Sequence, residues 1–482
     1  MSAERDNLIE NLTRHATIGS GGIVLASVPG SGCTTLLREV VEQIFSSAGE
    51  TIPIYFTIEP TDRNSSFTAK RFANSFLSQV VAFRRRNASL ANSAISLTEI
   101  GRLSAPQDIV WIDRAIERIS QNDSSGGTVL LERYLSIPLL ASSAGFRPFI
   151  IFDGFHDLLH IEDGKQLFEA IERIASVYDF PFVLAGRRRF VSGIKGFERI
   201  DLNRLSVDDA SDLALRIAEK NGVKVDDAAR DLIAVQTNSR PDLIQAILRR
   251  GYNPNSFPDV ERAYTEELFA GETGRNFDKI FDSAATGETQ QKLFKLLVDS
   301  TATGSKLVPV STWQKALGMD LMEFEKMLEI LNVTEVVRVT SNRVQRMADD
   351  IALSDYLNIR HRLETLGENR ATVYAASLAA SIRRAPKLMA LHYRTNSAIG
   401  LRELLTKFDG REVPLALLDN SVFKERYQGL SDAEISANIS TDTGTVKLPM
   451  FFFSAHTEAF YSPVAAAIER ERSPVALGFH KG

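Results

Sequence analysis

The chain has one cysteine, no long apolar run and almost no excess charge. A single cysteine, Cys33, excludes an internal disulfide and a zinc site built from several cysteines. No apolar run reaches membrane-spanning length and the polar first residues do not resemble a secretion signal, so we expect a cytoplasmic protein with no membrane partner. The net charge of -5 argues against broad electrostatic binding to nucleic acid or anionic lipid.

The composition is that of a globular protein with several domains. The chain has 482 residues, of which 44% are hydrophobic and 24% charged. Its first 200 residues alternate short apolar runs with amphipathic helices, a pattern that predicts a parallel sheet covered on both faces. The expected strands are Ile23–Ser27, Ile52–Ile58, Phe149–Phe152, Phe180–Ala185 and Arg199–Leu202. A Ser- and Asn-rich stretch at about 88–127 reads as an insertion containing one helix.

The chain changes character after this α/β segment, and we expect four parts. Residues 1–203 form the sheet domain, and residues 204–272 are helical. Residues 273–365 contain three helices followed by a hairpin, the pattern of a winged helix. Residues 366–482 mix helices with apolar runs and predict a small C-terminal α/β domain of unknown role.

A glycine-rich turn follows the first expected strand. A phosphate-binding loop needs a buried strand, a turn that exposes backbone N–H groups, and a helix that begins at the anion. The stretch Ser27–Thr34 has all three parts, but it departs from G-x-x-x-x-G-K-[ST] at its first glycine and at its lysine, where Cys33 stands. Thr34 can still place a hydroxyl on Mg²⁺. The candidate nucleotide-binding residues are Pro29, Gly30, Ser31, Gly32, Cys33, Thr34 and Thr35.

The change to cysteine removes a positive charge from the place where the β and γ phosphates would lie. A thiol is shorter than a lysine side chain and mostly neutral at pH 7. Backbone amides can still bind an anion, whereas hydrolysis suffers more because charge builds up in the transition state. We therefore expect binding without fast turnover.

Two acidic residues and an arginine complete the pattern. Asp153 ends an apolar strand and is expected to hold Mg²⁺ together with Thr34, while Asp157 is expected to orient the attacking water. Arg187 ends the next strand and can reach a γ-phosphate. The alternative for the run Arg187–Arg189 is a solvated stretch of charge.

Together these motifs resemble the signal-transduction ATPases with numerous domains, the STAND class, which are relatives of the AAA+ ATPases and include the NACHT and NB-ARC groups. The resemblance covers about residues 1–365. It implies that Asp157 is the catalytic acid, Arg187 the sensor arginine, and Pro241 the proline that packs against adenine. The sequence departs from the family at Ser239, where the family has glycine, and at Ala348, where a histidine would touch the ADP β-phosphate.

The resemblance implies a switch that binds ATP or ADP with Mg²⁺, hydrolyses slowly if at all, and acts through protein partners or self-association, with sensing in bacterial defence or regulation as its role. One alternative is an interaction scaffold with a vestigial nucleotide site. Another is a DNA-associated AAA+-type ATPase, although the expected recognition helix carries mostly acidic residues, which disfavour nucleic acid. Those residues are Asp320, Glu323, Glu325 and Glu329, against Lys326.

A zinc site is a further alternative for one segment. His156 and His160 are spaced as in H-E-x-x-H, with aspartate in place of glutamate. The sequence offers no evident third ligand, and the position is already explained by the expected Mg²⁺ site. We therefore favour the nucleotide interpretation.

Overall fold

The computed structural model describes residues 3–47, 49–92, 95–121, 127–249, 254, 256–302, 306–347, 349–395, 435–441, 444–453 and 477–480. The chain forms two compact units: residues 1–205, 240–242 and 276–349 make the first, and residues 206–239, 243–275 and 350–482 the second. The four-part division made from the sequence remains a proposal about organisation. Among the described residues, no helix has the length and apolar character needed to cross a membrane.

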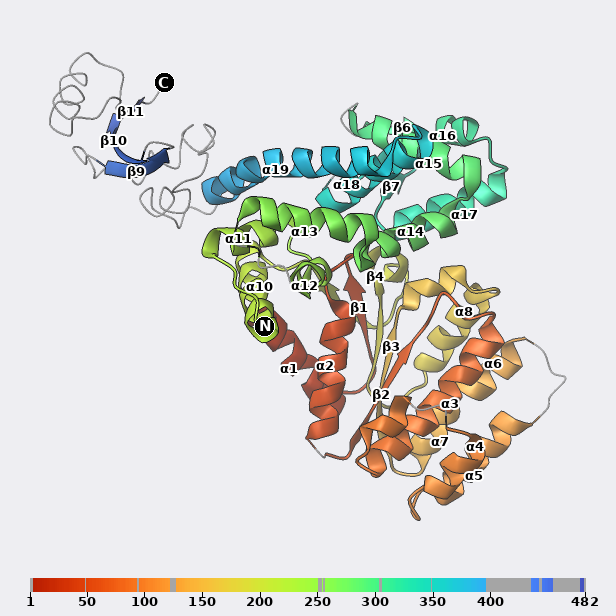
Figure 1. Cartoon of the computed structure of the whole chain (residues 1–482). Helices are drawn as coiled ribbons and strands as arrows, with labels where there is room; N and C mark the ends of the chain where they lie inside the picture. The colour runs from red at the N-terminus through yellow and green to blue at the C-terminus, as the bar shows by residue number, and fades with distance from the viewer. Residues whose placement is uncertain are drawn as a thin grey trace. The chain divides into compact units, whose positions relative to one another are not determined.

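The first unit is built around a parallel sheet. Its strands are β1 (Gly22–Ser27), β2 (Thr51–Thr57), β3 (Arg147–Asp153), β4 (Phe182–Arg187) and β5 (Glu198–Leu202). They lie in the order β2-β3-β4-β1-β5, all parallel (Figure 1). All five expected strands are confirmed, with ends shifted by a few residues.

Helices cover both faces of this sheet, which is why its inner strands are apolar throughout rather than alternating. On one face lie α1 (Ala3–Ile18) and α2 (Cys33–Ser46), whose Leu12 and Leu37 join a fully buried cluster. On the other lie α3 (Ser65–Arg84) and α8 (Gly164–Ala175), as Figure 1 shows. The predicted α/β fold with a doubly covered parallel sheet is confirmed.

The stretch expected to contain one helix was predicted wrongly. It contains a short 3-10 helix at Ala88–Asn92 followed by α4 (Leu97–Leu103) and α5 (Ile109–Ser120), and α6 (Thr128–Leu135) and α7 (Ile137–Ser143) follow. Trp111 and Ile112 of α5 are buried in the core cluster. Ser96 caps α4 and Ser104 follows its end, so this stretch reads as a loop in composition although α5 carries a clear apolar face.

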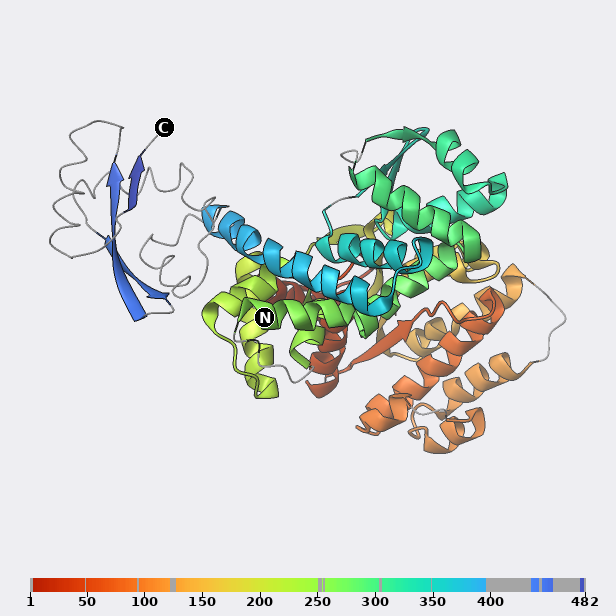
Figure 2. The ribbon, with the colours of Figure 1, turned by 45° about the horizontal axis from the view of Figure 1, so that its top comes forward.

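A helix–hairpin unit, residues 287–346, belongs to the first compact unit. It contains α15 (Gly287–Ala302), α16 (Val310–Leu317), α17 (Leu321–Val333) and a small sheet in the order β6-β8-β7. The strands are β6 (Val308–Pro309), β7 (Val337–Thr340) and β8 (Arg343–Arg346), and they lie beside these helices in both views (Figures 1 and 2). The sequence predicts three helices followed by a hairpin; the structure has in addition the short strand β6 between α15 and α16, and the winged-helix assignment stays a prediction.

Two arginines directly after β4 hold the helix–hairpin unit on the sheet domain. Arg188 donates two hydrogen bonds to Glu335, with Nε–Oε1 at 2.6 Å and Nη2–Oε2 at 2.7 Å. Arg189 donates from Nη1 to both the backbone oxygen and the side-chain oxygen of Asn332, each at 2.9 Å. These two residues are therefore not a solvated run of charge. They clamp the end of α17 next to the end of β4.

The second unit contains α10 (Val207–Asn221), α11 (Asp227–Gln236), α13 (Phe257–Ala270), α18 (Ile351–Arg360) and α19 (Arg370–Thr395). Ser206 caps α10 by accepting a hydrogen bond from the Asp209 amide, as the sequence predicts. The long α19 runs beside α13 in both views (Figures 1 and 2).

A buried polar contact joins these two helices. Ser381 of α19 donates to the fully buried Glu261 of α13, and burial raises the pKa of that carboxyl to about 7. Two further helices, α12 (Pro241–Arg249) and α14 (Glu272–Ala284), each have residues in both units.

The described part of the C-terminal region contains three strands, β9 (Ile435–Thr441), β10 (Gly444–Phe453) and β11 (Leu477–His480). β10 pairs antiparallel with β9 and parallel with β11. The small α/β domain expected there stays a prediction.

The Arg188 clamp predicts a measurable contribution to stability. Arg188→Ala should lower the free energy of unfolding of the first unit by about 1 kcal/mol, because a bidentate, partly buried pair loses its charge-assisted hydrogen bonds. Arg199→Ala is the matched control, since the Arg199–Asp201 pair is largely exposed at both ends. Urea denaturation should show an effect for the first variant and almost none for the second. Equal effects would contradict the clamp.

Candidate functional site

The loop between β1 and α2 has the backbone of an anion cradle. Gly30 and Gly32 have φ of 73° and 78°, the left-handed conformation that glycine adopts without strain. Gly32 caps α2 without a side-chain hydrogen bond, and the first turn of α2 contains no acidic residue. The first amides of the helix therefore remain available to an anion, and the helix dipole favours negative charge there.

Thr34 and Asp153, predicted from separate motifs, meet at the carboxyl edge of the sheet. The Thr34 hydroxyl donates to Oδ2 of Asp153 at 2.7 Å, and the Tyr55 hydroxyl donates to the same oxygen at 2.6 Å. The other carboxylate oxygen accepts from the backbone N–H of Gly154 at 2.8 Å. Asp153 is 5% exposed, so its carboxylate is largely shielded from water, whereas Thr34 is exposed.

Arg187 and Asp157 interact electrostatically with each other, and Asp157 also with Asp153. Arg187 ends β4, directly opposite Ser27 at the end of β1. Its Nε is buried without a hydrogen-bond partner, and burial lowers the pKa of its guanidinium. Asp157 stabilises the charged form of this guanidinium more than any other acidic group does. Burial raises the pKa of Asp157 to about 7, although the charge of Arg187 opposes the shift. A buried cation with an unsatisfied N–H suits an anionic ligand.

Cys33 lies at the first position of α2, half-buried against the α1–α2 side of the sheet. Burial and the charge of Asp153 both raise the pKa of its thiol. The side chain is therefore a neutral thiol at pH 7, and the lysine position provides no charge.

A different cation approaches the loop from the segment Arg240–Asp242, which belongs to the first compact unit. A Cβ atom added to Gly30 would collide with the guanidinium Nε of Arg240, and one added to Gly32 would lie 3.3 Å from Cγ of Pro241. Arg240 is 6% exposed, lies over the ring of Phe277, and pairs with Asp242 at 2.7 Å. Pro241 thus lies against the loop, and its packing against adenine stays a prediction.

The remaining predicted loop residues lie in the same turn. Pro29 precedes Gly30, and Thr35 is exposed on the first turn of α2. Ser31 is 2% exposed, and its hydroxyl is buried without a hydrogen-bond partner. A second unsatisfied polar group therefore lies in the loop itself.

Sequence reasoning missed Tyr55 and Arg240. Tyr55 lies inside an apolar strand, where an aromatic residue reads as core, and only the pairing of Thr57 with Asp153 reveals that its hydroxyl reaches the carboxylate. Arg240 is adjacent to the predicted Pro241. Its contact is with a loop some two hundred residues earlier in the chain, and such a contact gives no signal in the local sequence.

Three other expectations have mixed outcomes. His156 and His160 lie in a 3-10 helix, Phe155–His160, rather than on one face of an α-helix, and no group of three metal-binding side chains occurs among the described residues. The zinc alternative therefore finds no support. Ser239 has a φ of 55°, a conformation that favours glycine, the residue the family has there. Ala348 lies outside the described residues.

The residues present fit a nucleotide with Mg²⁺. The hydroxyl of Thr34 and the carboxylate of Asp153 are oxygen donors of the kind that Mg²⁺ prefers. The unpartnered Nε of Arg187 and hydroxyl of Ser31 are donors that suit phosphate oxygens. The two loop glycines add no side chains of their own, and Arg240 and Pro241 lie against them.

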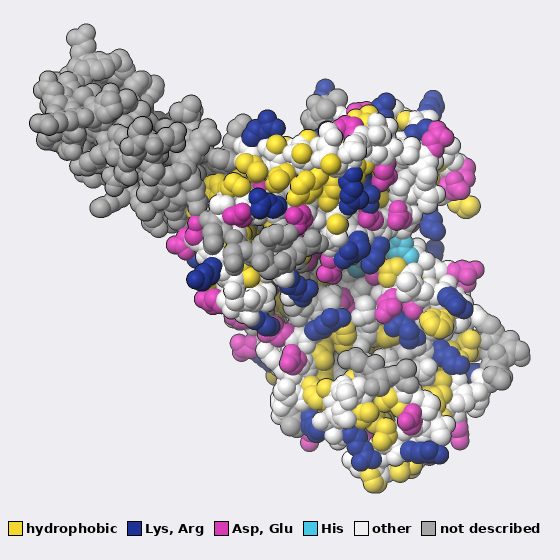
Figure 3. Space-filling model, in the orientation of Figure 1, with side chains coloured by type: hydrophobic (Ala, Val, Ile, Leu, Met, Phe, Trp, Pro, Cys, Tyr) yellow, Lys and Arg dark blue, Asp and Glu magenta, His cyan; other side chains and the backbone are white. Residues whose placement is uncertain are grey.

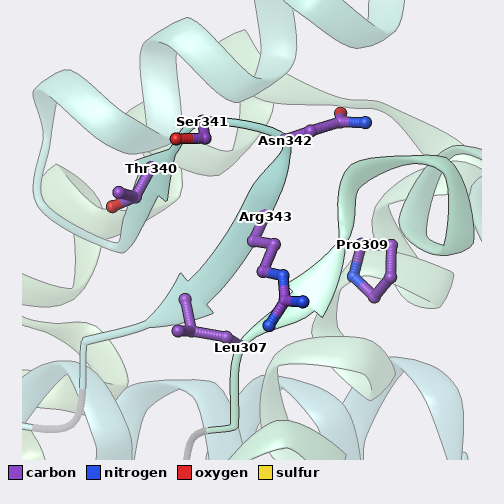
Figure 4. Close-up of a pocket in the computed structure, with 6 residues that line it drawn as sticks. All are labelled: Leu307, Pro309, Thr340, Ser341, Asn342 and Arg343. Atoms are coloured by element: carbon purple, nitrogen blue, oxygen red, sulfur yellow. The ribbon is translucent and has the colours of Figure 1, made fainter.

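The helix–hairpin unit has a shallow hollow of its own, with a volume of about 470 Å³. Figure 4 shows Arg343 extending between Leu307 and Pro309 below the turn Thr340–Asn342. Arg343 is the single charged side chain among its lining residues. On the face of the molecule in Figure 3, basic and acidic side chains intermingle among the described residues. Neither feature is a basic surface of the kind that binds nucleic acid broadly.

No family model matches the chain, and no curated protein matches it. Solved structures with a distant likeness include the Walker-type ATPase paby2304 of Pyrococcus abyssi, at 12% identity and a TM-score of 0.43 over 73% of this chain and 94% of that one. The Orc1 protein of Aeropyrum pernix in complex with DNA has 16% identity and a TM-score of 0.40 over 76% and 93%. The RuvB Holliday junction branch migration motor of Thermotoga maritima has 12% and 0.34 over 72% and 90%.

These likenesses, with TM-scores under 0.5, carry no argument about activity. The chain's own geometry is a five-stranded parallel sheet with a glycine-rich loop after β1, an aspartate at the end of β3 and an arginine at the end of β4. This is the α/β arrangement of a P-loop NTPase core.

The loop geometry predicts the effect of adding a methyl group at Gly30. Gly30→Ala should destabilise the first unit by about 1–2 kcal/mol, because alanine is strained at positive φ, and more if Arg240 cannot move aside. Gly21→Ala separates the two causes, since Gly21 has a φ of 75° with nothing within 4 Å of an added Cβ. Gly193→Ala, which has open space and no positive φ, is the neutral control.

Urea denaturation should rank the losses as Gly30→Ala largest, Gly21→Ala intermediate and Gly193→Ala smallest. Equal losses at Gly30 and Gly21 would show that Arg240 does not crowd the loop.

Proposed function

We propose that the protein is a STAND-like switch that binds ATP or ADP with Mg²⁺ and hydrolyses ATP slowly if at all. The observation that carries the proposal is the 2.7 Å hydrogen bond from Thr34 to Asp153. It joins the glycine-rich loop to the acidic strand end, and the two motifs lie 119 residues apart in the sequence. A chance glycine-rich turn gives no reason for such a pair to meet.

Each residue has a defined part in this proposal. The loop Pro29–Gly32 and the first amides of α2 bind phosphate oxygens, and Thr34 and Asp153 hold Mg²⁺. The Mg²⁺ ion, when bound, neutralises phosphate charge and orients the phosphate chain. Asp157 orients the attacking water, Arg187 contacts the γ-phosphate, and Pro241 packs against the base.

Arginines replace the charge that Cys33 does not provide. Arg187 has a buried N–H without a partner, and Arg240 lies against the loop at Gly30. Arg240 is balanced by Asp242, so its charge reaches a phosphate only in part. This supports binding with weak transition-state stabilisation, and therefore slow hydrolysis.

The same residues suggest how nucleotide state is transmitted. Arg187 is followed directly by Arg188 and Arg189, which hold the end of α17. Arg240 and Pro241 lie in a short segment between two stretches of the second unit. A change in phosphate contacts would therefore shift both the segment after β4 and the segment Arg240–Asp242. A switch needs this kind of coupling between ligand and structure. Protein partners or self-association, and a role in bacterial defence or regulation, follow from the family resemblance alone.

Two other functions compete with this proposal. A scaffold with a vestigial site has no reason to keep Thr34 and Asp153 in contact with each other. A DNA-associated ATPase needs a basic surface, whereas Glu323, Glu325 and Glu329 lie on α17 and are exposed. Salt-dependent DNA binding by the purified protein would favour the second alternative.

Nucleotide content is the most direct test. Freshly purified protein, denatured and analysed by chromatography, should release stoichiometric ADP or ATP, and Thr34→Ala should release much less because the Mg²⁺ hydroxyl is lost. Thr17→Ala is the control, since the exposed Thr17 hydroxyl bonds only to carbonyls of its own helix. No release from wild type, together with no shift of Tm on adding ATP, would contradict the proposal.

The raised pKa of Asp157 predicts how the rate of any hydrolysis depends on pH. Its carboxyl must be ionised to orient water, and its pKa is raised to about 7, so the rate should rise as pH increases through that value. Asp157→Asn should remove this rise along with most of the activity. Asp157→Glu, which keeps a carboxyl group on a side chain one methylene longer, should keep the rise. Phosphate release measured from about pH 6 to about pH 8.5 tests this, and a rate independent of pH in the wild type would rule out Asp157.

A further inference from the structure

We infer that Tyr55 is a positioning residue that caps the Mg²⁺-binding carboxylate of Asp153 and competes with a metal-bound water. The inference rests on the proposed function, because it concerns the same site. Its direct observation is the 2.6 Å hydrogen bond from the Tyr55 hydroxyl to Oδ2 of Asp153.

The hydrogen-bond sites of Asp153 are nearly filled by the protein itself. A carboxylate has about four lone-pair sites, two on each oxygen. Oδ2 accepts from Thr34 and Tyr55, and Oδ1 accepts from Gly154. One site remains for a water of the metal, where an uncapped carboxylate would offer two.

The two hydroxyl groups differ in what they allow. Thr34 can donate its proton to Asp153 while a lone pair of the same oxygen binds Mg²⁺. Tyr55 only donates to Asp153, so it takes an acceptor site and gives no metal ligand in return. Tyr55, rather than Thr34, is therefore the group that a metal-bound water displaces when it takes a site on Oδ2.

The backbone of Tyr55 is fixed while its ring has space to move. The side-chain amide of Gln79 accepts from the Tyr55 N–H at 2.8 Å and donates to the Tyr55 carbonyl at 2.9 Å. The side chain borders a hollow of about 620 Å³ between α2 and α3. The guanidinium of Arg38, an exposed residue one helical turn after Thr34, lies 5.7 Å from the ring centroid. A rotation of the side chain alone can therefore uncap Asp153.

The experiment compares metal-dependent binding in wild type and Tyr55→Phe, which keeps the ring and removes the hydroxyl. The affinity for fluorescent ATP is measured once in the presence of Mg²⁺ and once in the presence of EDTA. The readout is the affinity with Mg²⁺ divided by the affinity with EDTA. The ratio should rise about tenfold in the variant, the effect of removing one hydrogen bond to a charged group. Tyr178→Phe is the matched control, because its buried hydroxyl donates to the Leu135 carbonyl at 2.7 Å, in a different part of the core.

A second readout separates this inference from the proposed function. Mn²⁺ is added without nucleotide, and Tm is measured for the same three proteins. Tyr55→Phe should be stabilised by Mn²⁺ more than wild type and Tyr178→Phe. If no protein binds nucleotide but Tyr55→Phe gains this Mn²⁺ effect, the proposed function fails and the cap stands.

Two results overturn the cap. An unchanged ratio and an unchanged Mn²⁺ effect in Tyr55→Phe would show that the hydroxyl does not compete with the metal. A lower ratio in Tyr55→Phe would show that Tyr55 holds Asp153 in position for the metal instead.

Discussion

The candidate site depends on one constraint: the carboxyl ends of parallel strands meet at the same edge of a sheet. Because β1 pairs with β4 and β2 pairs with β3, the strand ends bring Ser27 opposite Arg187 and Thr57 opposite Asp153. The glycine-rich loop leaves the sheet at this edge, and Thr34 reaches Asp153 from the first turn of the helix that follows. A shift of one residue in any strand would turn the terminal side chain to the opposite face and separate these groups.

Charge at this edge is arranged unusually for a phosphate site. Cys33 is a neutral thiol, so positive charge comes from Arg187 and Arg240. A lysine within the loop would place its positive charge at the site whenever the loop is folded. These two arginines come instead from the end of β4, next to the clamp on the helix–hairpin unit, and from the short segment Arg240–Asp242. On the proposed function, affinity for phosphate then depends on where those segments lie, and phosphate in turn biases their positions.

The sequence predicts the parts of this arrangement whose signals are local. Five buried strands appear as apolar runs, and Thr34, Asp153 and Arg187 stand where such runs end. The partners that approach from elsewhere carry no such signal. Arg188 and Glu335 are 147 residues apart and look like ordinary surface charge until the contact is seen. Strand pairing decides what Tyr55 touches, and the packing of a distant segment decides what lies over Gly30, so neither follows from local periodicity or turn chemistry.

On the proposed function, Cys33 and Tyr55 both weaken the binding of Mg²⁺-nucleotide, each by a different physical effect. The thiol withholds a charge that would attract phosphate, and the phenol fills an acceptor site that would hold a water of the metal. Neither change removes the fold of the loop or the Thr34–Asp153 contact, so the cradle persists while its intrinsic attraction for Mg²⁺-nucleotide falls. A site weakened in this way cannot hold its ligand by the loop alone. On the proposed function, the remaining affinity comes from Arg187, Arg240 and Pro241, and these residues couple the ligand to the segments that a switch would move.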